Sequence, residues 1–493
     1  MSNPGEVTAP PGESRLLIDG KLVDAEAGAT YPNVNPATEE VIGHVADASA
    51  SDTDTAIEAA RRAFDTTTWS TDRQLRRHCL YQLQAALESE RELFRTELIS
   101  EVGTPLLMTY GPQLDMPLTD AVTYPADAIA DFPWERELVP VGEGAATSRR
   151  VVVKEAAGVV GAIVPWNFPL EISLHKLAQA LATGNSVVLK AAPDTPWNAT
   201  HLGRLIAEQT DIPPGVVNVI TSSSHQRGQQ LVTDPRVDLI SFTGSTTTGR
   251  RIMELGAPTL KRLFLELGGK SANIVLDDAD FVTALAGAIF VCINAGQGCA
   301  LPTRILLPRS RYDEGVDIVA ENFKSVKYGD PTDPEVLAGP VINEKQRDRV
   351  MGYIDKGVAE GARLVQGGKR PGHLKRGYYV EPTLFADVEN SMTIAQEEIF
   401  GPVLVLVAYD DDDDAVRIAN DSIYGLSGVV NSGSLERGLA VARRIRTGTI
   451  GVNGGNWYAA DSPFGGYKAS GIGRQGGIEG FEQYLETKTI AYP

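Results

Sequence analysis

The chain has 493 residues, which is too long for one hydrophobic core, so more than one domain is expected. Its 64 acidic and 45 basic residues give a formal net charge of −19, and such a surface repels phosphate backbones, so nucleic acid is not an expected partner. No apolar run reaches the roughly 18 residues that a membrane helix needs, so no membrane contact is expected. The 3 cysteines do not form a disulfide framework, which favours a cytoplasmic protein in a reducing compartment.

The first 150 residues predict short strands followed by helices. Leu16 to Val23 is typical of a hairpin that turns at Asp19–Gly20. Apolar residues at helical spacing then predict a long helix from Asp72 to Val102. Residues 121–149 contain proline and lack a regular period, so they indicate either a protruding hairpin or a segment that crosses between domains.

From residue 151 onward, short apolar runs alternate with helical segments. The runs at 158–164 and 186–190 suit strands buried on both faces, and Thr195 with Pro196 predicts the start of the next helix. A second series of strands and helices follows residue 260. This alternation predicts mostly parallel sheets with helices on both faces.

The stretch 290–300 ends a helical pattern with two glycines and Cys299. A cysteine after a glycine-containing turn can present both its sulfur and its backbone N–H to a ligand. A lone cysteine beside a helix is also typical of core packing, so a nucleophile and a structural residue are both open interpretations. Cys292, seven residues earlier, is interpreted as a core residue.

Glu266 lies inside an otherwise apolar strand, Leu265 to Leu267, which is unusual because burial disfavours a charged carboxylate. A carboxylate with a raised pKa suits a general base near neutral pH. A structural glutamate held in a salt bridge is the alternative interpretation.

Three further positions suit ligand binding. Ser245 lies between a strand and a helix, where backbone N–H groups bind phosphate, although a simple helix cap is equally compatible. Lys190 ends a buried strand, at the edge where open α/β sheets bind ligands, so it can hold ribose hydroxyls or phosphate, and a plain surface lysine is the alternative. Asn167, between two prolines, can donate to a developing oxyanion or can serve only the turn.

No metal site is predicted. The six histidines show no metal-ligand spacing with the cysteines. The acidic run from Asp410 to Asp414 is expected to form a solvated loop and a helix cap, because contiguous carboxylates rarely converge on one ion.

Six segments in this order resemble the aldehyde dehydrogenase superfamily over nearly the whole chain. They read PWNFP at 165–169, FTGS at 242–245, LELGGK at 265–270, GQGC at 296–299, EIFGP at 398–402 and PFGGYK at 463–468. The resemblance implies an NAD(P)-dependent enzyme of the hydrolytic type that oxidises an aldehyde to its carboxylic acid through a thioester on the cysteine.

The resemblance also implies roles for individual residues. Cys299 is the implied nucleophile, Asn167 the oxyanion donor, Glu266 the base for water, and Lys176 a proton-relay partner. The implied cofactor-binding residues are Val164, Pro165, Trp166, Lys190, Gly228, Gly244, Ser245, Leu267, Glu398 and Phe400. The implied substrate-tunnel residues are Glu171, His175, Ile293, Trp457, Tyr458 and Phe464.

By the same resemblance we expect an α/β protein with two Rossmann-like parallel-sheet domains and a small β oligomerisation flap. The expected limits are 1–125 and 150–264 for the cofactor domain, 265–452 for the catalytic domain, and 126–149 with 470–493 for the flap. A homodimer or homotetramer is expected, with a small-molecule aldehyde as the substrate.

Two positions depart from the family pattern. Many NAD-preferring members carry a glutamate where this chain has Pro193, so NAD is expected while NADP stays possible. Some members carry a proton-relaying glutamate where this chain has Gln475. A CoA-acylating dehydrogenase, which usually lacks the equivalent of Glu266, and a non-catalytic binding protein on the same fold are the alternative functions.

Overall fold

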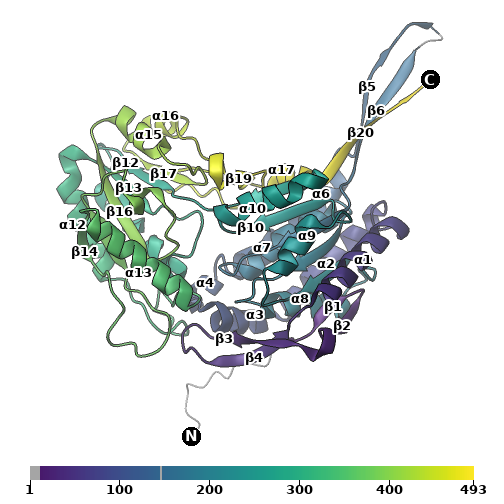
Figure 1. Cartoon of the computed structure of the whole chain (residues 1–493). Coiled ribbons are helices and arrows are strands. Elements are labelled where there is room, and N and C mark those ends of the chain that lie inside the picture. The colour runs from purple at the N-terminus through teal and green to yellow at the C-terminus, as the bar shows by residue number, and fades with distance from the viewer. Residues whose placement is uncertain (1–11, 145–146) are drawn as a thin grey trace.

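The computed structural model describes residues 12–144 and 147–493. Two α/β lobes lie side by side, and a narrow β hairpin projects from one of them (Figure 1). The predicted α/β class with two Rossmann-like domains is confirmed, because each lobe is built on a mainly parallel sheet. Within the described residues, no helix is long and apolar enough to cross a membrane.

The first domain is built on an eight-stranded sheet. In spatial order its strands are β19 (Gly471–Ile472), β11 (Arg262–Glu266), β10 (Leu239–Thr243), β7 (Val159–Ile163), β8 (Ser186–Lys190), β9 (Val217–Ile220), β1 (Leu16–Ile18) and β2 (Lys21–Val23). The five strands from β11 to β9 run parallel, so their carboxyl ends share one edge. The predicted hairpin at 16–23 is present, with positive φ at Asp19 and Gly20.

Helices cover both faces of this sheet. They are α1 (Ala50–Thr66), α2 (Arg73–Ser89), α3 (Arg91–Glu97), α4 (Leu106–Thr109), α5 (Asp115–Asp120), α6 (Thr123–Asp131), α7 (Pro169–Ala182), α8 (Trp197–Gln209), α9 (Gln226–Thr233), α10 (Thr246–Gly256) and α17 (Gly477–Glu482). Successive residues of β7 alternate between the two cores: Val159 packs with α1, whereas Val160 packs with α7 and α8. Strands buried on both faces explain the continuous apolar runs. A small hairpin, β3 (Thr30–Val34) and β4 (Val41–Ala46), lies beside this domain.

The single long helix expected from Asp72 to Val102 is wrong. The helix is interrupted at Glu90, and a π-helical turn (Leu98–Val102, η2) ends the segment. The Glu90 carboxylate accepts hydrogen bonds from His201 at 2.8 Å and from Arg204 of α8, so a tertiary contact holds the break.

Glu101 shows how this domain satisfies a helix end. Its buried carboxylate accepts from the backbone N–H of Trp197 at 2.9 Å and of Asn198 at 3.0 Å, at the start of α8. The predicted Thr195 side-chain cap does not form, since α8 has no side-chain cap of its own. A carboxylate at a helix N-terminus meets the free N–H groups and the positive end of the helix dipole.

The second domain is built on a seven-stranded sheet. In spatial order its strands are β14 (Arg363–Gln366), β15 (Thr383–Ala386), β16 (Val403–Tyr409), β13 (Arg304–Pro308), β12 (Ala272–Val275), β17 (Gly428–Asn431) and β18 (Gly451–Val452). Its helices are α11 (Phe281–Ala286), α12 (Tyr312–Lys324), α13 (Glu344–Ala359), α14 (Thr393–Gln396), α15 (Asp412–Asn420) and α16 (Leu435–Ala442). The strands from β15 to β18 are parallel, as the alternation predicts.

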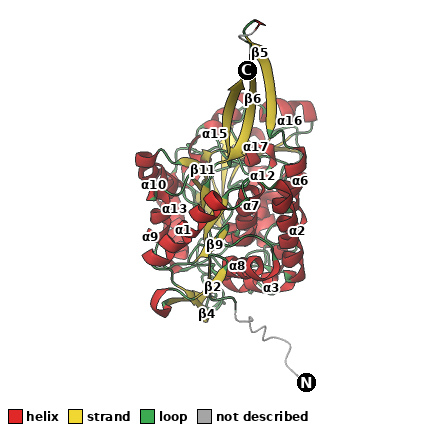
Figure 2. Cartoon of the chain, turned by 90° about the vertical axis from the view of Figure 1, so that its right-hand side faces the viewer, coloured by secondary structure: helices red, strands yellow, loops and turns green. Residues whose placement is uncertain are grey.

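A three-stranded antiparallel sheet stands away from the first domain (Figures 1 and 2). Its strands are β5 (Glu135–Val141), β6 (Ser148–Ala156) and β20 (Leu485–Tyr492). The sheet thus includes residues 150–156, assigned from the sequence to the cofactor domain. Residues 471–472, assigned to the flap, pair instead with β11 of the large sheet. The reason is strand pairing: β6 continues past residue 150 because it has β20 as a partner along its length.

Candidate active site

Glu266 and Lys176 lie where the carboxyl ends of the central strands of the first sheet meet helix α7. Glu266 is the last residue of β11 and is paired in register with Thr243 of β10. Lys176 comes from α7, which packs against β7 and β8. Both side chains are buried, with 3% and 0% of their surface exposed. The parallel topology therefore brings the two residues into the same interior region.

Cys299 follows a turn whose backbone only glycine can complete. Residues 287–296 form a 3-10 segment (η5) that ends with positive φ at Asn294, Ala295 and Gly296. A Cβ placed on Gly296 would lie 2.1 Å from the carbonyl carbon and oxygen of Gly401. Gly298 has no such constraint, because its Cβ would meet only the Leu301 side chain. Of the two glycines before Cys299, only Gly296 is therefore required by the backbone.

A network of amides fixes Asn167 next to this turn. The Asn167 side chain donates to the Gln297 carbonyl at 3.0 Å, and the Asn167 carbonyl accepts from the Asn294 amide at 3.1 Å. Gln113 donates to the same Asn167 carbonyl at 2.8 Å. Since an amide nitrogen carries two N–H groups, one remains for a ligand. The Cys299 N–H has no backbone acceptor among the described residues either.

Burial dominates the electrostatics of Glu266 and Lys176. Loss of solvation raises the pKa of Glu266 well above its ordinary value, and the charges of Lys176 and Arg474 oppose that shift in part. Burial lowers the pKa of Lys176 to about 8, opposed by Glu266 and Glu171. Neither oxygen of Glu266 has a hydrogen-bond partner among the described residues. This places an unpartnered carboxyl beside an amine that exchanges its proton near neutral pH, the arrangement a general base needs.

Burial also raises the pKa of the Cys299 thiol, and the carboxylates of Glu398, Glu266 and Glu171 raise it further. The residue nonetheless keeps part of its surface accessible. A Cβ on Gly269, in the loop after β11, would lie 2.4 Å from the Cys299 carbonyl oxygen, so this glycine brings the two loops together. Cys292, by contrast, is fully buried, as interpreted from the sequence.

The residues that the resemblance implies for a dinucleotide follow the carboxyl ends of the parallel strands. Val164, Pro165 and Trp166 follow β7; Lys190 ends β8; Gly244 and Ser245 follow β10; Leu267 follows β11; Gly228 lies in α9; Glu398 and Phe400 come from the second domain. Ser245 caps α10 and is exposed at its N-terminus, where free N–H groups suit a pyrophosphate.

Two glycines of this region lie next to implied cofactor-binding side chains, and only Gly268 is close enough to require the absence of a side chain. A Cβ on Gly268 would lie 2.3 Å from the Glu398 carboxylate, which accepts from the Gly269 N–H at 3.0 Å. A Cβ on Gly228 would lie 3.7 Å from the Lys190 stem. Trp166 and Phe400 meet edge to face, with ring centroids 5.3 Å apart. These side chains fit a dinucleotide: a helix N-terminus for phosphate, a lysine and a carboxylate for ribose hydroxyls, and aromatic rings for flat groups.

Most of the implied tunnel residues form an aromatic and acidic cluster. The Tyr458 hydroxyl donates to Glu171 at 2.5 Å, and His175 lies 3.5 Å from the same carboxylate oxygen. Trp457 stacks on Phe464 with ring centroids 5.6 Å apart. Ile293, the last of the set, is half-buried at the turn before Cys299. Burial raises the pKa of Glu171 to about 7 and lowers that of His175 to about 4, so His175 is neutral near pH 7.

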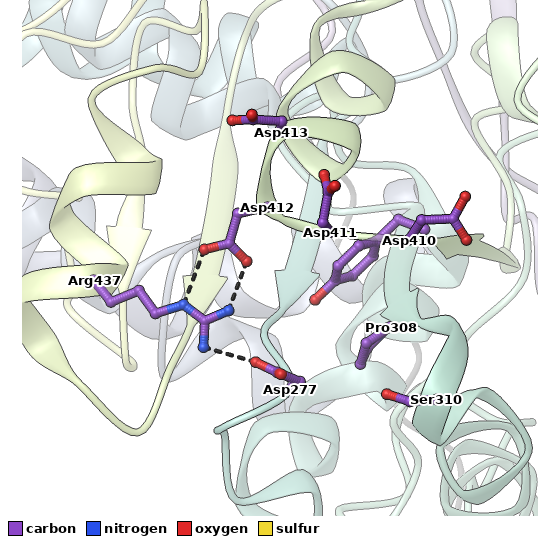
Figure 3. A pocket seen from close by; sticks show the side chains of 9 residues that line it. Asp277, Pro308, Ser310, Asp410, Asp411, Asp412, Asp413 and Arg437 are labelled. Carbon is purple, nitrogen blue, oxygen red and sulfur yellow. Dashed lines mark hydrogen bonds and ion pairs between the residues drawn. The ribbon is translucent and has the colours of Figure 1, made fainter.

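The acidic run lies apart from these residues, on the second domain. Asp411 caps α15 by accepting from the Asp414 N–H at 2.9 Å, which matches the expected helix cap. Beside it a surface hollow of about 420 Å³ is crossed by Arg437, which pairs with Asp412 at 2.6 Å and with Asp277 at 2.7 Å (Figure 3). The carboxylates of the acidic run thus form ion pairs with arginines or accept hydrogen bonds at the N-terminus of α15.

The two mainly parallel sheets, together with a cysteine held in place by close glycine contacts, are typical of an α/β enzyme. The model of the aldehyde dehydrogenase family matches residues 22–490, so the chain belongs to that family and is an oxidoreductase that acts on aldehydes. A 3-succinoylsemialdehyde-pyridine dehydrogenase from Pseudomonas is 43% identical over 96% of this chain and 98% of its own length.

Solved structures agree over the full length. The aldehyde dehydrogenase of Mycobacterium tuberculosis, complexed with NAD+, superimposes with a TM-score of 0.93 at 43% identity and covers 98% of this chain and 99% of its own. Aldehyde dehydrogenase C of Pseudomonas syringae, complexed with NAD+ and octanal, gives 0.91 at 38% identity, covering 99% of this chain and 98% of its own.

Some residues at the site carry no role in the sequence interpretation. Asn294 and Gln297 lie inside the cysteine stretch, where two amides close to Gly296 are a usable signal for a hydrogen-bonded turn. Asp47 and Asp194, whose charges act on Lys190, have no such signal. Their positions follow from the packing of distant segments.

We predict that Gly296→Ala destabilises the turn and lowers activity. Left-handed backbone alone costs an alanine about 1–2 kcal/mol, and the clash with the Gly401 backbone adds to this. Thermal unfolding and aldehyde-oxidation assays test it, with Gly298→Ala as the matched control. Equal melting temperatures and rates for the two variants would contradict the assigned constraint.

Proposed function

We propose that this enzyme oxidises an aldehyde to its carboxylic acid with NAD, through a thioester on Cys299 that water then hydrolyses. The observation that carries the proposal is the unpartnered, fully buried carboxyl of Glu266 beside Lys176, in the region whose charges also act on Cys299. A hydrolytic enzyme needs such a base, whereas a CoA-acylating enzyme transfers the acyl group to a thiol. A non-catalytic binding protein on this fold has no need of a desolvated carboxyl, since it costs stability.

In the first half-reaction, the Cys299 sulfur attacks the aldehyde carbon after losing its proton. The second N–H of the Asn167 amide and the Cys299 N–H stabilise the resulting oxyanion. When bound, NAD supplies the hydride acceptor, and the acyl group remains on Cys299 as a thioester. Because burial holds the thiol protonated, we expect the sulfur to lose its proton only when substrate and cofactor change its surroundings.

In the second half-reaction, Glu266 removes a proton from water as the water oxygen attacks the thioester. Burial makes Glu266 a strong base once ionised, because its carboxylate gains much by taking a proton. Lys176 can then accept that proton from Glu266, because its lowered pKa leaves a fraction of the Lys176 amines neutral near pH 7. Splitting the reaction this way replaces one difficult step with two easier ones.

The first domain would hold the cofactor, with Lys190 on ribose hydroxyls, Ser245 at the pyrophosphate and Trp166 beside the rings. Glu398 and Phe400 would reach the cofactor from the second domain, Glu398 on ribose hydroxyls and Phe400 beside the rings. Two carboxylates support NAD over NADP. Asp47 and Asp194 act electrostatically on Lys190, and negative charge there disfavours a 2′-phosphate. They supply the repulsion that the family glutamate, here Pro193, does not.

For the substrate we propose medium-sized or aromatic aldehydes. Trp457, Tyr458 and Phe464 offer flat apolar walls, and Glu171 with its Tyr458 hydrogen bond provides a polar end. Two relatives are named for aromatic substrates: one for a pyridine semialdehyde, and the other, an indole-3-acetaldehyde dehydrogenase of Pseudomonas syringae, has a TM-score of 0.93 at 36% identity.

We predict different failures for Cys299→Ala and Glu266→Gln. The first should abolish oxidation altogether, while the second should reduce about one equivalent of NAD per active site and then turn over roughly 10²- to 10⁴-fold more slowly. Rapid-mixing measurements of NADH formation, with mass spectrometry of the acylated protein, test both. Cys292→Ala is the matched control and should behave as the parent enzyme. Glu266→Gln without a trapped thioester would remove Glu266 from its role.

We predict that kcat/KM for phenylacetaldehyde exceeds that for acetaldehyde by about 10- to 100-fold, because burying an aromatic ring contributes about 1.5–3 kcal/mol. Trp457→Ala should reduce the first value and leave the second nearly unchanged. Steady-state kinetics with aliphatic, aromatic and amino aldehydes, each with NAD and NADP, test the substrate and the cofactor together. An enzyme faster on acetaldehyde, or one that prefers NADP, would contradict the respective proposal.

We propose that the flap, which the structure forms from β5, β6 and β20, joins subunits in a dimer or tetramer. Its sheet exposes apolar side chains, with 82% of Val139 and 44% of Ile490 accessible, and a small projecting sheet is poorly stable alone.

Light scattering at micromolar concentration should give two or four chain masses, and Val139→Asp should lower that number. Leu260→Asp is the control, because Leu260 is 90% exposed on another part of the molecule. A monomeric parent protein would defeat the prediction.

A further inference from the structure

Two hydroxyls that form a chain of hydrogen bonds with Lys176 have no role in the mechanism above. The Lys176 Nζ donates to the Ser241 Oγ at 3.1 Å, and that oxygen is bonded to the Tyr484 hydroxyl at 2.9 Å. All three side chains have 0% of their surface exposed. They come from α7, from β10 and from the residue just before β20, so three distant segments supply one continuous chain.

Apolar rings surround this chain. The Lys176 Nζ lies 4.6 Å from the centre of the Phe264 ring, which meets the Tyr484 ring edge to face at 6.2 Å. Within the described residues, the Ser241 hydroxyl is the one side-chain acceptor that the ammonium reaches, and no ion pair includes Lys176. The charges of Glu266 from β11 and of Glu171 from its own helix act on the amine without a direct contact, and the charge of Lys176 acts in turn on His175 of the same helix.

We propose that Ser241 and Tyr484 are positioning residues for hydrolysis of the thioester, whose hydroxyls hold the Lys176 amine beside Glu266 and stabilise its ammonium form. This inference rests on the function proposed above and adds two residues to it. A hydroxyl oxygen has two lone pairs and one proton, so Ser241 can accept from the ammonium while it donates to, or accepts from, Tyr484. Hydrogen bonds to a charged group inside a protein are stronger than those between neutral groups.

The proton balance shows why this support matters. As water attacks, its oxygen bonds to the acyl carbon, one proton goes to the Glu266 carboxylate, and the carbon–sulfur bond breaks to leave the thiolate. Glu266 then gives its proton to the neutral Lys176 amine, which becomes ammonium. In a desolvated site that cation needs a partner, and Gln475, where some members carry a glutamate, cannot accept the proton as a carboxylate would.

The chain of hydrogen bonds ends at the buried Tyr484 hydroxyl, so it can fix the position of the amine but cannot carry the proton to solvent. The Tyr484 backbone is itself fixed, since its carbonyl accepts from the Asn185 amide at 3.0 Å and from the Ala157 N–H at 3.0 Å. Tyr484 immediately precedes β20, the strand that pairs with β6 in the projecting sheet. The tail strand is therefore tied directly to the amine at the active site.

Ser241→Ala and Tyr484→Phe test the proposal in the full-length enzyme. Each should leave the burst of NADH near one equivalent and slow hydrolysis of the trapped acyl group by about tenfold. Both should leave kcat/KM for the aldehyde unchanged, because thioester formation precedes the slowed step, so kcat and KM should fall together. Removing a hydroxyl disfavours the ammonium, so the pKa of Lys176 falls further. Because the neutral amine is the acceptor, the rising limb of kcat against pH should move to lower pH by about one unit.

Tyr409→Phe is the matched control, because it removes a buried tyrosine hydroxyl that donates to the Val275 carbonyl at 2.8 Å in the other domain. This variant should keep the parent pH profile and acyl hydrolysis. If both test variants lose thermal stability but keep the parent profile and hydrolysis rate, the two residues are only structural and the inference is overturned.

A lost burst in both test variants would also overturn it, since the defect would then lie in thioester formation. Failure of the underlying function looks different: Glu266→Gln would then deacylate rapidly. If Glu266→Gln traps the thioester while Ser241→Ala and Tyr484→Phe are normal, only the role of the two hydroxyls is refuted.

Discussion

The interaction on which the site depends is the coupling between the Glu266 carboxyl and the Lys176 amine in an environment without solvent. Burial disfavours both charged forms, raising the pKa of one and lowering that of the other, so their proton affinities approach each other. Two groups of similar affinity can pass a proton at little cost, which two solvent-exposed groups with ordinary pKa values cannot do near pH 7. The surrounding helices and strand ends keep this region buried.

Glycine is the second requirement, because loops from both domains must touch at backbone distance. Gly296 lets the cysteine turn pass against the Gly401–Pro402 backbone, and Gly269 lets the loop after β11 lie on the Cys299 carbonyl. Any side chain at these positions would force the loops apart. Fixing Cys299 relative to Glu266 is therefore a matter of backbone packing, with the Asn167 and Gln297 amides holding the turn.

The two domains and the tail each contribute different residues to the site. The first sheet brings the carboxyl ends of its parallel strands to one edge, which explains why residues from 164 to 267 gather there. The second domain adds Cys299 and Glu398 from the other side. The tail returns across the first domain, where Tyr484 reaches Ser241, before it pairs with β6. The surface proposed for assembly and the tyrosine proposed to position Lys176 therefore lie in adjacent parts of one segment.

The sequence by itself determined the alternating α/β design, because strands buried on both faces need continuous apolar runs. It also indicated the residues that we propose carry the chemistry, because few residue types suit that work. Glu266 stood out as a carboxylate in an apolar strand, and Cys299 as a cysteine after a glycine turn. Local pattern could not predict the break at Glu90, which His201 and Arg204 of α8 hold, or the cap on α8, which comes from Glu101 about a hundred positions earlier. Nor could it show that Gly296 is required whereas Gly298 is not. The tertiary structure alone decided these points, along with the chain from Lys176 through Ser241 to Tyr484, because each depends on contacts between segments that are distant in sequence and meet only when the sheets pack.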